Sequence, residues 1–182
     1  MIGYCDIAPG CEWHGLYHDT EYGFPTDDEA ALFERLVLEI NQAGLSWLTI
    51  LKKRAGFVAA FERFDVDKVA NYGDCDRARL LDDPGIIRNK LKVNAAIHNA
   101  GVIRELRASH GSFFDWLTEQ QKHNRNNKDD WVNLFKKTFK FTGDKITGEF
   151  LMSTGFLPGA HRESCPVFAE IAKLEPPWMC GA

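Results

Sequence analysis

One acidic residue interrupts an apolar stretch of the sequence, "LVLEINQAGLSW", which runs from Leu36 to Trp47. At about 100° per residue, Glu39 falls at the edge of a helix face that contains Leu32, Leu36 and Ile40. Two interpretations are open. The carboxylate either ends the apolar face, with its stem packed and its head in water, or lines a pocket and contacts a positively charged group there.

Two pairs of cysteine and histidine occur near opposite ends of the chain. In "HRESC", His161 and Cys165 are four positions apart, so one helical turn points both the same way. Cys5 and His18 supply the same two ligand types near the other end. Two Cys and two His make a closed tetrahedral zinc site, which would hold the N- and C-terminal segments together. With six His and five Cys in the chain, unrelated scattered residues are the alternative.

Aromatic residues surround Glu39 in the sequence: Trp13, Tyr17, Tyr22 and Trp47. Aromatic faces bind flat ligands, including bases that have been flipped out of a nucleic acid. For any single one of these residues, packing in the core is the ordinary alternative.

A sharp turn lies within "DDPGIIRNK", Asp82 to Lys90. Pro84 and Gly85 form the turn, and a long helix is expected soon after it. The pattern is similar to a helix-hairpin-helix, in which backbone N–H groups of the turn and the next helix bind a DNA phosphate. Arg88 and Lys90 would add positive charge. A plain connection between two helices is the alternative.

The elements that position these residues are predicted to be helices. Thr26 and Glu29 form a capping box for a helix that runs to about Ala43, and Gly44 suits its C-terminal cap. Ser46 is expected to cap the next helix, "WLTILKKR". Glu39 and Trp47 would therefore meet at a tight corner between two helices.

Further helices are expected over "DVDKVANY", "CDRARLLDD", "NKLKVNAAIHNAGVIREL", "DDWVNLFKKTF" and "DKITGEFLMSTG". Little of the sequence alternates as a strand does, apart from "FKFTG". The predicted class is all-α, a single domain over residues 1–182 with two possible helical lobes around a pocket. The polar segment "EQQKHNRNNKDD", Glu119 to Asp130, is interpreted as a solvated connection between the two halves.

The composition is that of an ordinary globular protein, with 45% hydrophobic and 26% charged residues in 182 positions. The net charge of −4 means that any contact with nucleic acid must be local. No apolar run is long enough for a membrane span, and the N-terminal residues lack a secretory pattern. Five cysteines then favour a reducing cytoplasm, with Cys11, Cys75 and Cys180 structural or free. A monomer is expected.

Three segments together resemble the 3-methyladenine DNA glycosylase I family. They are "YHDTEYGFPTDDEAALFERLVLEINQAGLSWLTILKKR", "PGIIRNKLKVNAAIHNA" and "FKFTG…FLMSTGFLPGAHRESC". The resemblance covers most of residues 4–165, and "QAGLSW" followed by "LKKR" is its most specific part. It implies a helix-hairpin-helix glycosylase fold with a zinc site that joins the terminal segments, and excision of 3-methyladenine from double-stranded alkylated DNA.

The resemblance also implies roles for individual residues. The family's zinc ligands fall on Cys5, His18, His161 and Cys165. Its base-contacting acid falls on Glu39, and its base-stacking aromatics include Tyr17 and Trp47. Leu45 corresponds to a residue that fills the space left by the extruded nucleotide.

The sequence departs from the family in two places. Ile7 stands where the family commonly has a tryptophan, so one wall of the base pocket changes. Trp13 would replace that tryptophan only if the segment "DIAPGCEWHG" folds inward. The segment before Phe139 is also shorter than usual, which alters what covers the pocket.

Two alternative functions are considered, of which the ligand count disfavours the second. A non-catalytic zinc-stabilised helical domain would bind damaged DNA or a small ligand and release no base. A zinc hydrolase would need an open metal position, which four protein ligands do not leave.

Overall fold

The arrangement of the helices is seen in a computed structural model that describes residues 3–124 and 127–180. Helices account for all its regular structure, and no strand occurs in these ranges, in agreement with the predicted class. In chain order the elements are α1 (Tyr4–Ile7), α2 (Glu12–Thr20), α3 (Glu29–Gln42), α4 (Trp47–Ala60), the short 3₁₀ helix η1 (Glu62–Phe64), α5 (Val66–Ala70), α6 (Asp74–Asp82), α7 (Lys90–His110), α8 (Phe113–Asn124), α9 (Lys128–Thr138), α10 (Asp144–Ser153) and α11 (Pro166–Lys173).

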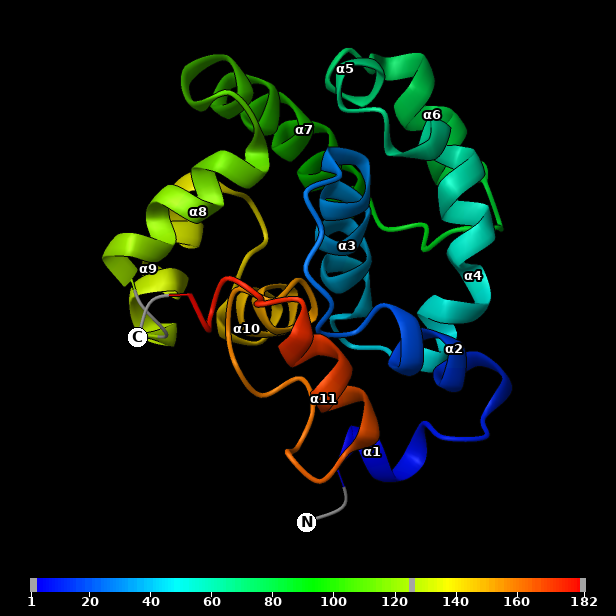
Figure 1. The fold of residues 1–182 in the computed structure, drawn as a ribbon. Helices are drawn as coiled ribbons and strands as arrows, with labels where there is room; N and C mark the ends of the chain where they lie inside the picture. Colours follow the sequence, from blue (N-terminus) through cyan, green and yellow to red (C-terminus); the bar gives the residue numbers. More distant parts are fainter. Residues whose placement is uncertain (1–2, 125–126, 181–182) are drawn as a thin grey trace.

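Helix α3 lies in the middle of the molecule (Figure 1) and packs against α4, α7, α8 and α10. Helices α4, α5 and α6 lie on one side of it, and α8, α9 and α10 lie on the other. Helices α1, α2 and α11 gather at one end, so segments from both ends of the sequence are neighbours there. The central helix can therefore present residues to both halves of the protein.

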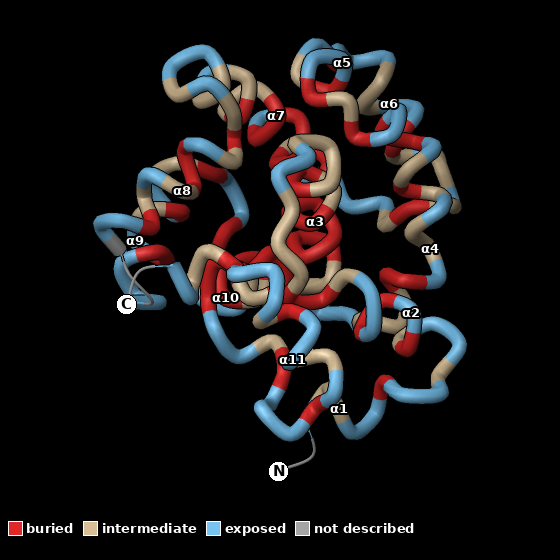
Figure 2. Tube along the Cα trace, in the orientation of Figure 1, coloured by how far each residue is buried: buried red, intermediate tan, exposed pale blue. Residues whose placement is uncertain are grey.

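The burial of α3 follows from its sequence pattern. Leu32, Phe33, Leu36 and Ile40 are fully buried, and Figure 2 shows the helix buried over most of its length. They belong to a hydrophobic core that extends through α10. A helix this deeply buried carries its polar residues inside the protein too, and these are the residues to examine for function.

The N-terminal cap of α3 differs from the prediction. Thr26 does not cap the helix; the Asp28 side chain does, by accepting a hydrogen bond from the backbone N–H of Ala31. Both residue types are good caps, and the acid two positions later starts the helix at Glu29. The other end agrees with the prediction: the helix stops at Gln42, followed by Gly44 at a φ of 84°.

Ser46 caps α4 as predicted, since its hydroxyl accepts a hydrogen bond from the Thr49 N–H. The polar segment from Glu119 to Asp130, in contrast, is mostly helical: α8 extends to Asn124, and Asn127 caps α9. The remaining residues of that segment, Arg125 and Asn126, lie outside the described residues. Polar composition alone did not separate an exposed helix end from a loop.

Helix α4 packs against the turn at Pro84 and Gly85, the place of the predicted hairpin. A Cβ atom placed on Gly56 would lie 2.4 Å from the carbonyl oxygen of Gly85, so only glycine allows the turn to approach this closely. One turn earlier on α4, the Lys53 ammonium donates a hydrogen bond to the Pro84 carbonyl at 2.6 Å. The turn is therefore fixed against the helix that follows Ser46. No helix within the described ranges is both long and apolar enough to cross a membrane.

Candidate active site

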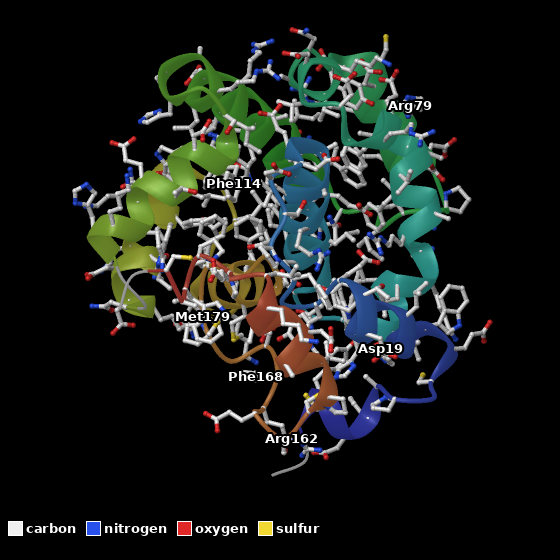
Figure 3. The ribbon with its side chains drawn as sticks, viewed as in Figure 1. Asp19, Arg79, Phe114, Arg162, Phe168 and Met179 are labelled. Atoms are coloured by element: carbon white, nitrogen blue, oxygen red, sulfur yellow. The ribbon has the colours of Figure 1, made fainter. Side chains whose placement is uncertain are left out.

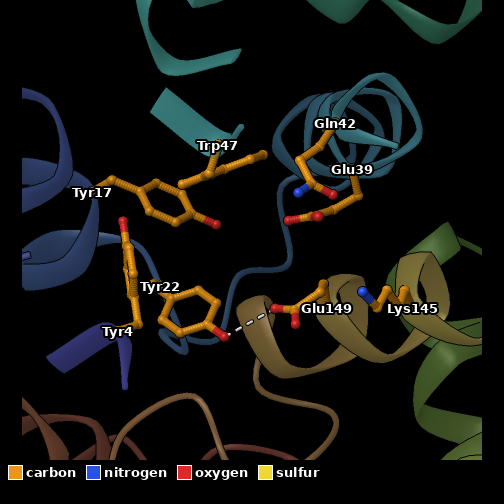
Figure 4. Close-up of a pocket in the computed structure, with 8 residues that line it drawn as sticks. All are labelled: Tyr4, Tyr17, Tyr22, Glu39, Gln42, Trp47, Lys145 and Glu149. Atoms are coloured by element: carbon orange, nitrogen blue, oxygen red, sulfur yellow. Dashed lines mark hydrogen bonds between the residues drawn. The ribbon is translucent and has the colours of Figure 1, made fainter. Parts of the chain in front are cut away.

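A cavity of about 290 Å³ opens where α3, α4 and α10 meet the N-terminal segments (Figure 4). Its walls come from five helices and the loop after α2. The lining residues are Tyr4, Tyr17, Tyr22, Glu39, Gln42, Trp47, Lys145 and Glu149. The cavity is close to the lower end of the size range of small-ligand sites, and its walls combine aromatic rings with acidic groups.

Glu39 lies inside the protein, with only 4% of its surface exposed. Burial raises the pKa of its carboxyl group to about 8, and the nearby Glu149 carboxylate adds to the shift, while the Arg35 guanidinium opposes it. Glu39 therefore holds its proton at neutral pH when the cavity is empty. This burial excludes the interpretation of Glu39 as a solvated carboxylate at the end of an apolar face. The position agrees with the other interpretation, a carboxyl group that lines a pocket.

Three tyrosines and one tryptophan form the aromatic walls. The ring centroids of Tyr17 and Trp47 lie 5.1 Å apart, and those of Tyr4 and Tyr22 lie 5.2 Å apart. Behind Tyr17, the buried Arg35 donates a hydrogen bond to the phenol oxygen at 2.6 Å and stacks over the ring. These contacts fix the orientation of Tyr17.

The structure brings together three of the four aromatic residues noted in the sequence. The exception is Trp13, which is 40% exposed and lies in a separate surface depression beside Leu16 and Leu51. Trp13 is in α2 and is not among the residues that line the cavity, so it does not supply the wall expected of a tryptophan at the position of Ile7. Ile7 is also exposed, at 55%.

Four further lining residues had no predicted role: Tyr4, Gln42, Lys145 and Glu149. Tyr4 is next to the predicted metal ligand Cys5, and Gln42 is three positions from Glu39. Their closeness in sequence to predicted site residues was therefore a signal that could have identified both. Lys145 and Glu149 lie one turn apart on α10, and their approach to α3 is a long-range contact. No local pattern in the sequence indicates that contact.

The corner between α3 and α4 exposes Leu45, at 39% of its surface. The positive φ of Gly44 turns the chain, and the backbone N–H of Leu45 donates to the Gln42 carbonyl at 2.7 Å. Lys145 lines both the aromatic cavity and the depression beside this corner. A small ligand in the cavity would therefore lie next to a macromolecule bound at the corner.

The predicted DNA-binding turn lies between α6 and α7. Arg88 and Lys90 are exposed there, but the backbone N–H of Gly85 already donates to the Asp83 carboxylate at 2.6 Å. The N–H groups of Leu91 and Lys92 at the start of α7 are likewise bonded, to the Asn89 side chain. The exposed side chains of Arg88 and Lys90 are therefore the groups of this turn that are open to an anion.

Cys5, His18, His161 and Cys165 form a cluster that can hold a metal ion, with one ligand atom of each within 4.8 Å of the others. The His161 Nδ1 atom lies 3.6 Å from the Cys5 sulfur and 3.5 Å from the Cys165 sulfur. The Cys165 sulfur lies 3.8 Å from His18 Nε2. A tetrahedral zinc with ordinary bond lengths separates sulfur and nitrogen ligands by about 3.6 Å, so the cluster fits that ion.

Hydrogen bonds on the far sides of the two imidazoles support this use. His18 Nδ1 donates to the Asp19 carboxylate at 2.7 Å, and His161 Nε2 donates to the backbone carbonyl of Tyr22 at 2.7 Å. Each bond leaves the inward nitrogen with a lone pair for a metal. Arg162, seen at the same end of the molecule as Asp19 in Figure 3, pairs with Asp6 of α1 and adds a second link between the terminal segments.

Comparison with known proteins gives a consistent result. The profile of the family described as methyladenine glycosylase matches residues 12–168. The chain is 36% identical over 157 residues to DNA-3-methyladenine glycosylase 1 of Escherichia coli strain K12, covering 78% of this chain and 84% of that protein. It is 32% identical over 178 residues to DNA-3-methyladenine glycosylase of Haemophilus influenzae, covering 86% and 96%.

A solved structure agrees with these relatives. The structure of 3-methyladenine DNA glycosylase I from Staphylococcus aureus, described as the basis of 3-methyladenine recognition, superposes with a TM-score of 0.79 at 30% identity. The match covers 90% of this chain and 95% of that one.

Proposed function

Since this chain belongs to the methyladenine glycosylase family, we propose that it is a DNA base-excision repair enzyme that hydrolyses the N-glycosidic bond of 3-methyladenine in alkylated DNA. The observation that carries this proposal is a buried acid, Glu39, in an aromatic cavity large enough for a flat base. The geometry of the cavity supports a role for Tyr17, Tyr22 and Trp47 in binding the base.

The chemistry needs little from the protein. Methylation at N3 makes adenine cationic in the nucleotide, so the bond to deoxyribose is already weak. The enzyme must flip the nucleotide out of the duplex, a step that is least costly for a damaged base. The C1′–N9 bond then breaks, its electron pair moves onto the purine and neutralises it, and water adds to the sugar.

Glu39 is proposed to contact the edge of the base, and the electron-rich rings of Tyr17 and Trp47 to stack on a cationic purine. No Asp or Glu occurs from Pro84 to Arg104, directly after the hairpin, where many related glycosylases place an acid that assists the sugar cation. Its absence is consistent with a monofunctional enzyme that acts on a labile lesion.

The DNA duplex is proposed to bind across the turn at Gly85 and the exposed corner at Leu45. Arg88 and Lys90 would contact backbone phosphates, and Leu45 would enter the gap left by the flipped nucleotide. The pocket, the corner and the turn all belong to one chain, so the proposed active form is a monomer. The cysteines of the described residues form no disulfide bonds, which favours the cytoplasm as the proposed location.

The cluster of Cys5, His18, His161 and Cys165 is proposed to hold one structural zinc. Four protein ligands leave no open coordination position, so the ion would join the terminal segments and take no part in the reaction. His161 is also bonded to Tyr22 in the cavity wall, so the zinc would support the pocket from behind.

The proposal is tested by incubating the protein with DNA methylated by an alkylating agent and identifying the released bases. Release of 3-methyladenine with an intact sugar–phosphate backbone is expected. Binding to the same DNA without release of any base would instead support the non-catalytic binding domain.

A further inference from the structure

A second carboxylate faces the cavity. Glu149 of α10 lies across from Glu39 of α3 in Figure 4, and both helices contribute to the same walls. The Tyr22 hydroxyl donates a hydrogen bond to Glu149 Oε2 at 3.1 Å, which fixes the acid toward the cavity. Resting on the proposed function, we propose that Glu149 is a specificity-determining residue whose negative charge restricts the cavity to bases that carry a positive charge.

The two acids are not equivalent. Glu39 is fully buried and its pKa is raised to about 8, in part by the charge of Glu149. Glu149 is only half-buried and accepts the Tyr22 hydrogen bond. The cavity therefore holds one enclosed acid, Glu39, and one acid closer to solvent, Glu149, whose position is fixed by Tyr22.

The other groups that face Glu39 do not cancel this charge. Arg35 lies behind Tyr17 and is paired with Glu21, outside the cavity. Lys145 is exposed at the rim. Burial raises the pKa of the three tyrosines that line the cavity, Tyr4, Tyr17 and Tyr22, so all stay neutral.

The fixed charge separates classes of base. A cationic N-alkylated purine is attracted to the carboxylate when it enters the cavity. A neutral base also displaces water from the carboxylate, but no charge–charge attraction offsets that desolvation cost. The same charge also favours substrate over product, because the purine becomes neutral when the C1′–N9 electron pair moves onto it. Glu149 thus disfavours retention of the excised base.

The test compares two small ligands that differ in charge and need no catalysis. They are 3-methyladenine, which is neutral as the free base, and 3,9-dimethyladeninium, which carries a fixed positive charge. Calorimetric titration of each into the full chain gives the dissociation constants. Wild-type protein should bind the cation more tightly than the neutral base.

In Glu149→Gln, the amide keeps the volume of the acid and an oxygen acceptor for Tyr22. Affinity for the cation should fall about tenfold, the effect of losing one partly screened charge pair, while affinity for the neutral base stays within about twofold. Lys145→Ala, an exposed substitution, should raise affinity for the cation and leave the neutral base unchanged. Glu105→Gln, on the surface of α7, is the control and should change neither.

Equal losses for both ligands in Glu149→Gln would make the residue part of the wall only and overturn the proposal, as would unchanged affinity for the cation. These outcomes are independent of base release. If wild-type protein excises no base from methylated DNA, the proposed function fails, whereas the ratio of the two dissociation constants still decides the role of Glu149 as a charge filter for the cavity.

Discussion

The ammonium group of Lys92 donates a hydrogen bond to the backbone carbonyl of Ala43 at 2.7 Å, and a second to the carbonyl of Asn41 at 2.9 Å. Lys92 is in the first turn of α7, directly after the turn proposed to bind DNA, and is only 5% exposed. It therefore satisfies carbonyls at the C-terminal end of α3, where the helix dipole favours a cation. The turn proposed to bind DNA and the corner at Leu45 are therefore linked by the Lys92 side chain.

Replacing Lys92 by methionine should loosen the corner. The aliphatic stem remains, but a buried carbonyl (Asn41) and a partly buried one (Ala43) lose their donor. This loss should lower the free energy of unfolding by about 1–3 kcal/mol in urea titrations. Excision of 3-methyladenine should fall further than stability explains, with partial recovery in Lys92→Arg. Lys136→Met, on the exposed face of α9, is the matched control. Wild-type excision in Lys92→Met would show that the link serves stability alone.

Glu39→Gln is expected to slow excision by about tenfold or more, with binding to lesion DNA largely retained. The amide keeps one acceptor oxygen but adds a misplaced donor toward the base, and a mismatched buried hydrogen bond costs about 1–3 kcal/mol. Single-turnover excision and a separate binding titration distinguish the two effects. An unchanged rate would remove Glu39 from the reaction.

The raised pKa of Glu39 also predicts a dependence of stability on pH. The native protein holds this proton up to about pH 8, whereas the unfolded chain releases it near 4.5. The contribution of Glu39 to the free energy of unfolding is therefore fully present below about pH 4.5 and is lost as pH rises to about 8. Urea titrations across this range should show a decline of a few kcal/mol in the wild type that is absent from Glu39→Gln. Parallel curves would contradict the assigned pKa.

Gly56→Ala should displace the turn at Gly85, which is proposed to bind DNA. The added methyl group would overlap the Gly85 carbonyl oxygen. Because that oxygen belongs to the backbone, it cannot move away as the end of a flexible side chain could. We expect a loss of about 1–3 kcal/mol in stability and weaker binding to both damaged and undamaged duplexes. Gly101→Ala, at a helical position with open space around it, is the control. Equal DNA affinity in Gly56→Ala and wild type would show that the turn is only a connector.

Arg88→Ala and Lys90→Ala should each weaken DNA binding without changing the free energy of unfolding, because both side chains are exposed. The loss should not depend on base sequence. The slope of the logarithm of affinity against the logarithm of salt concentration should decrease by about 0.9 for each phosphate contact removed. A salt slope equal to that of wild type in both variants would place the DNA on another surface.

Metal analysis of purified protein should find one zinc ion per chain. Cys165→Ala should lose it and lower the melting temperature, because the terminal segments would then be joined mainly by weaker contacts. Excision per folded molecule should change less than stability does. Absence of zinc from the wild type, or an unchanged melting temperature in the variant, would leave the cluster without a metal role.

Local signals in the sequence were sufficient for much of this architecture. The corner was predictable because Gly44 and Ser46 each have one strong structural preference. Thr26 was misassigned because Asp28 competes for the same role two positions later. For Glu39, at the edge of the apolar face, the sequence left a solvated and a pocket-lining position open, and the central place of α3 in the fold decided between them.

Contacts between distant segments were beyond local reasoning. Glu149 reaches the cavity only because α10 packs on α3, and Lys92 reaches Ala43 only because α7 crosses its end. A lysine in the first turn of a helix predicts solvent exposure, and an acid in the middle of one predicts a solvated face. Lys92 instead bonds a residue 49 positions away, Ala43, and Glu149 bonds one 127 positions away, Tyr22.

The cluster near the two ends of the sequence has a consequence for how the protein is made. Cys5 meets His161 across 156 positions, and Tyr22 in the cavity wall is held by the same histidine. Chains grow from the N-terminus, and early segments fold before late ones leave the ribosome. Tyr4 and Tyr17 are thus synthesised long before the residues that fix their end of the cavity. A growing chain therefore has no finished cavity until the segment that carries His161 has left the ribosome.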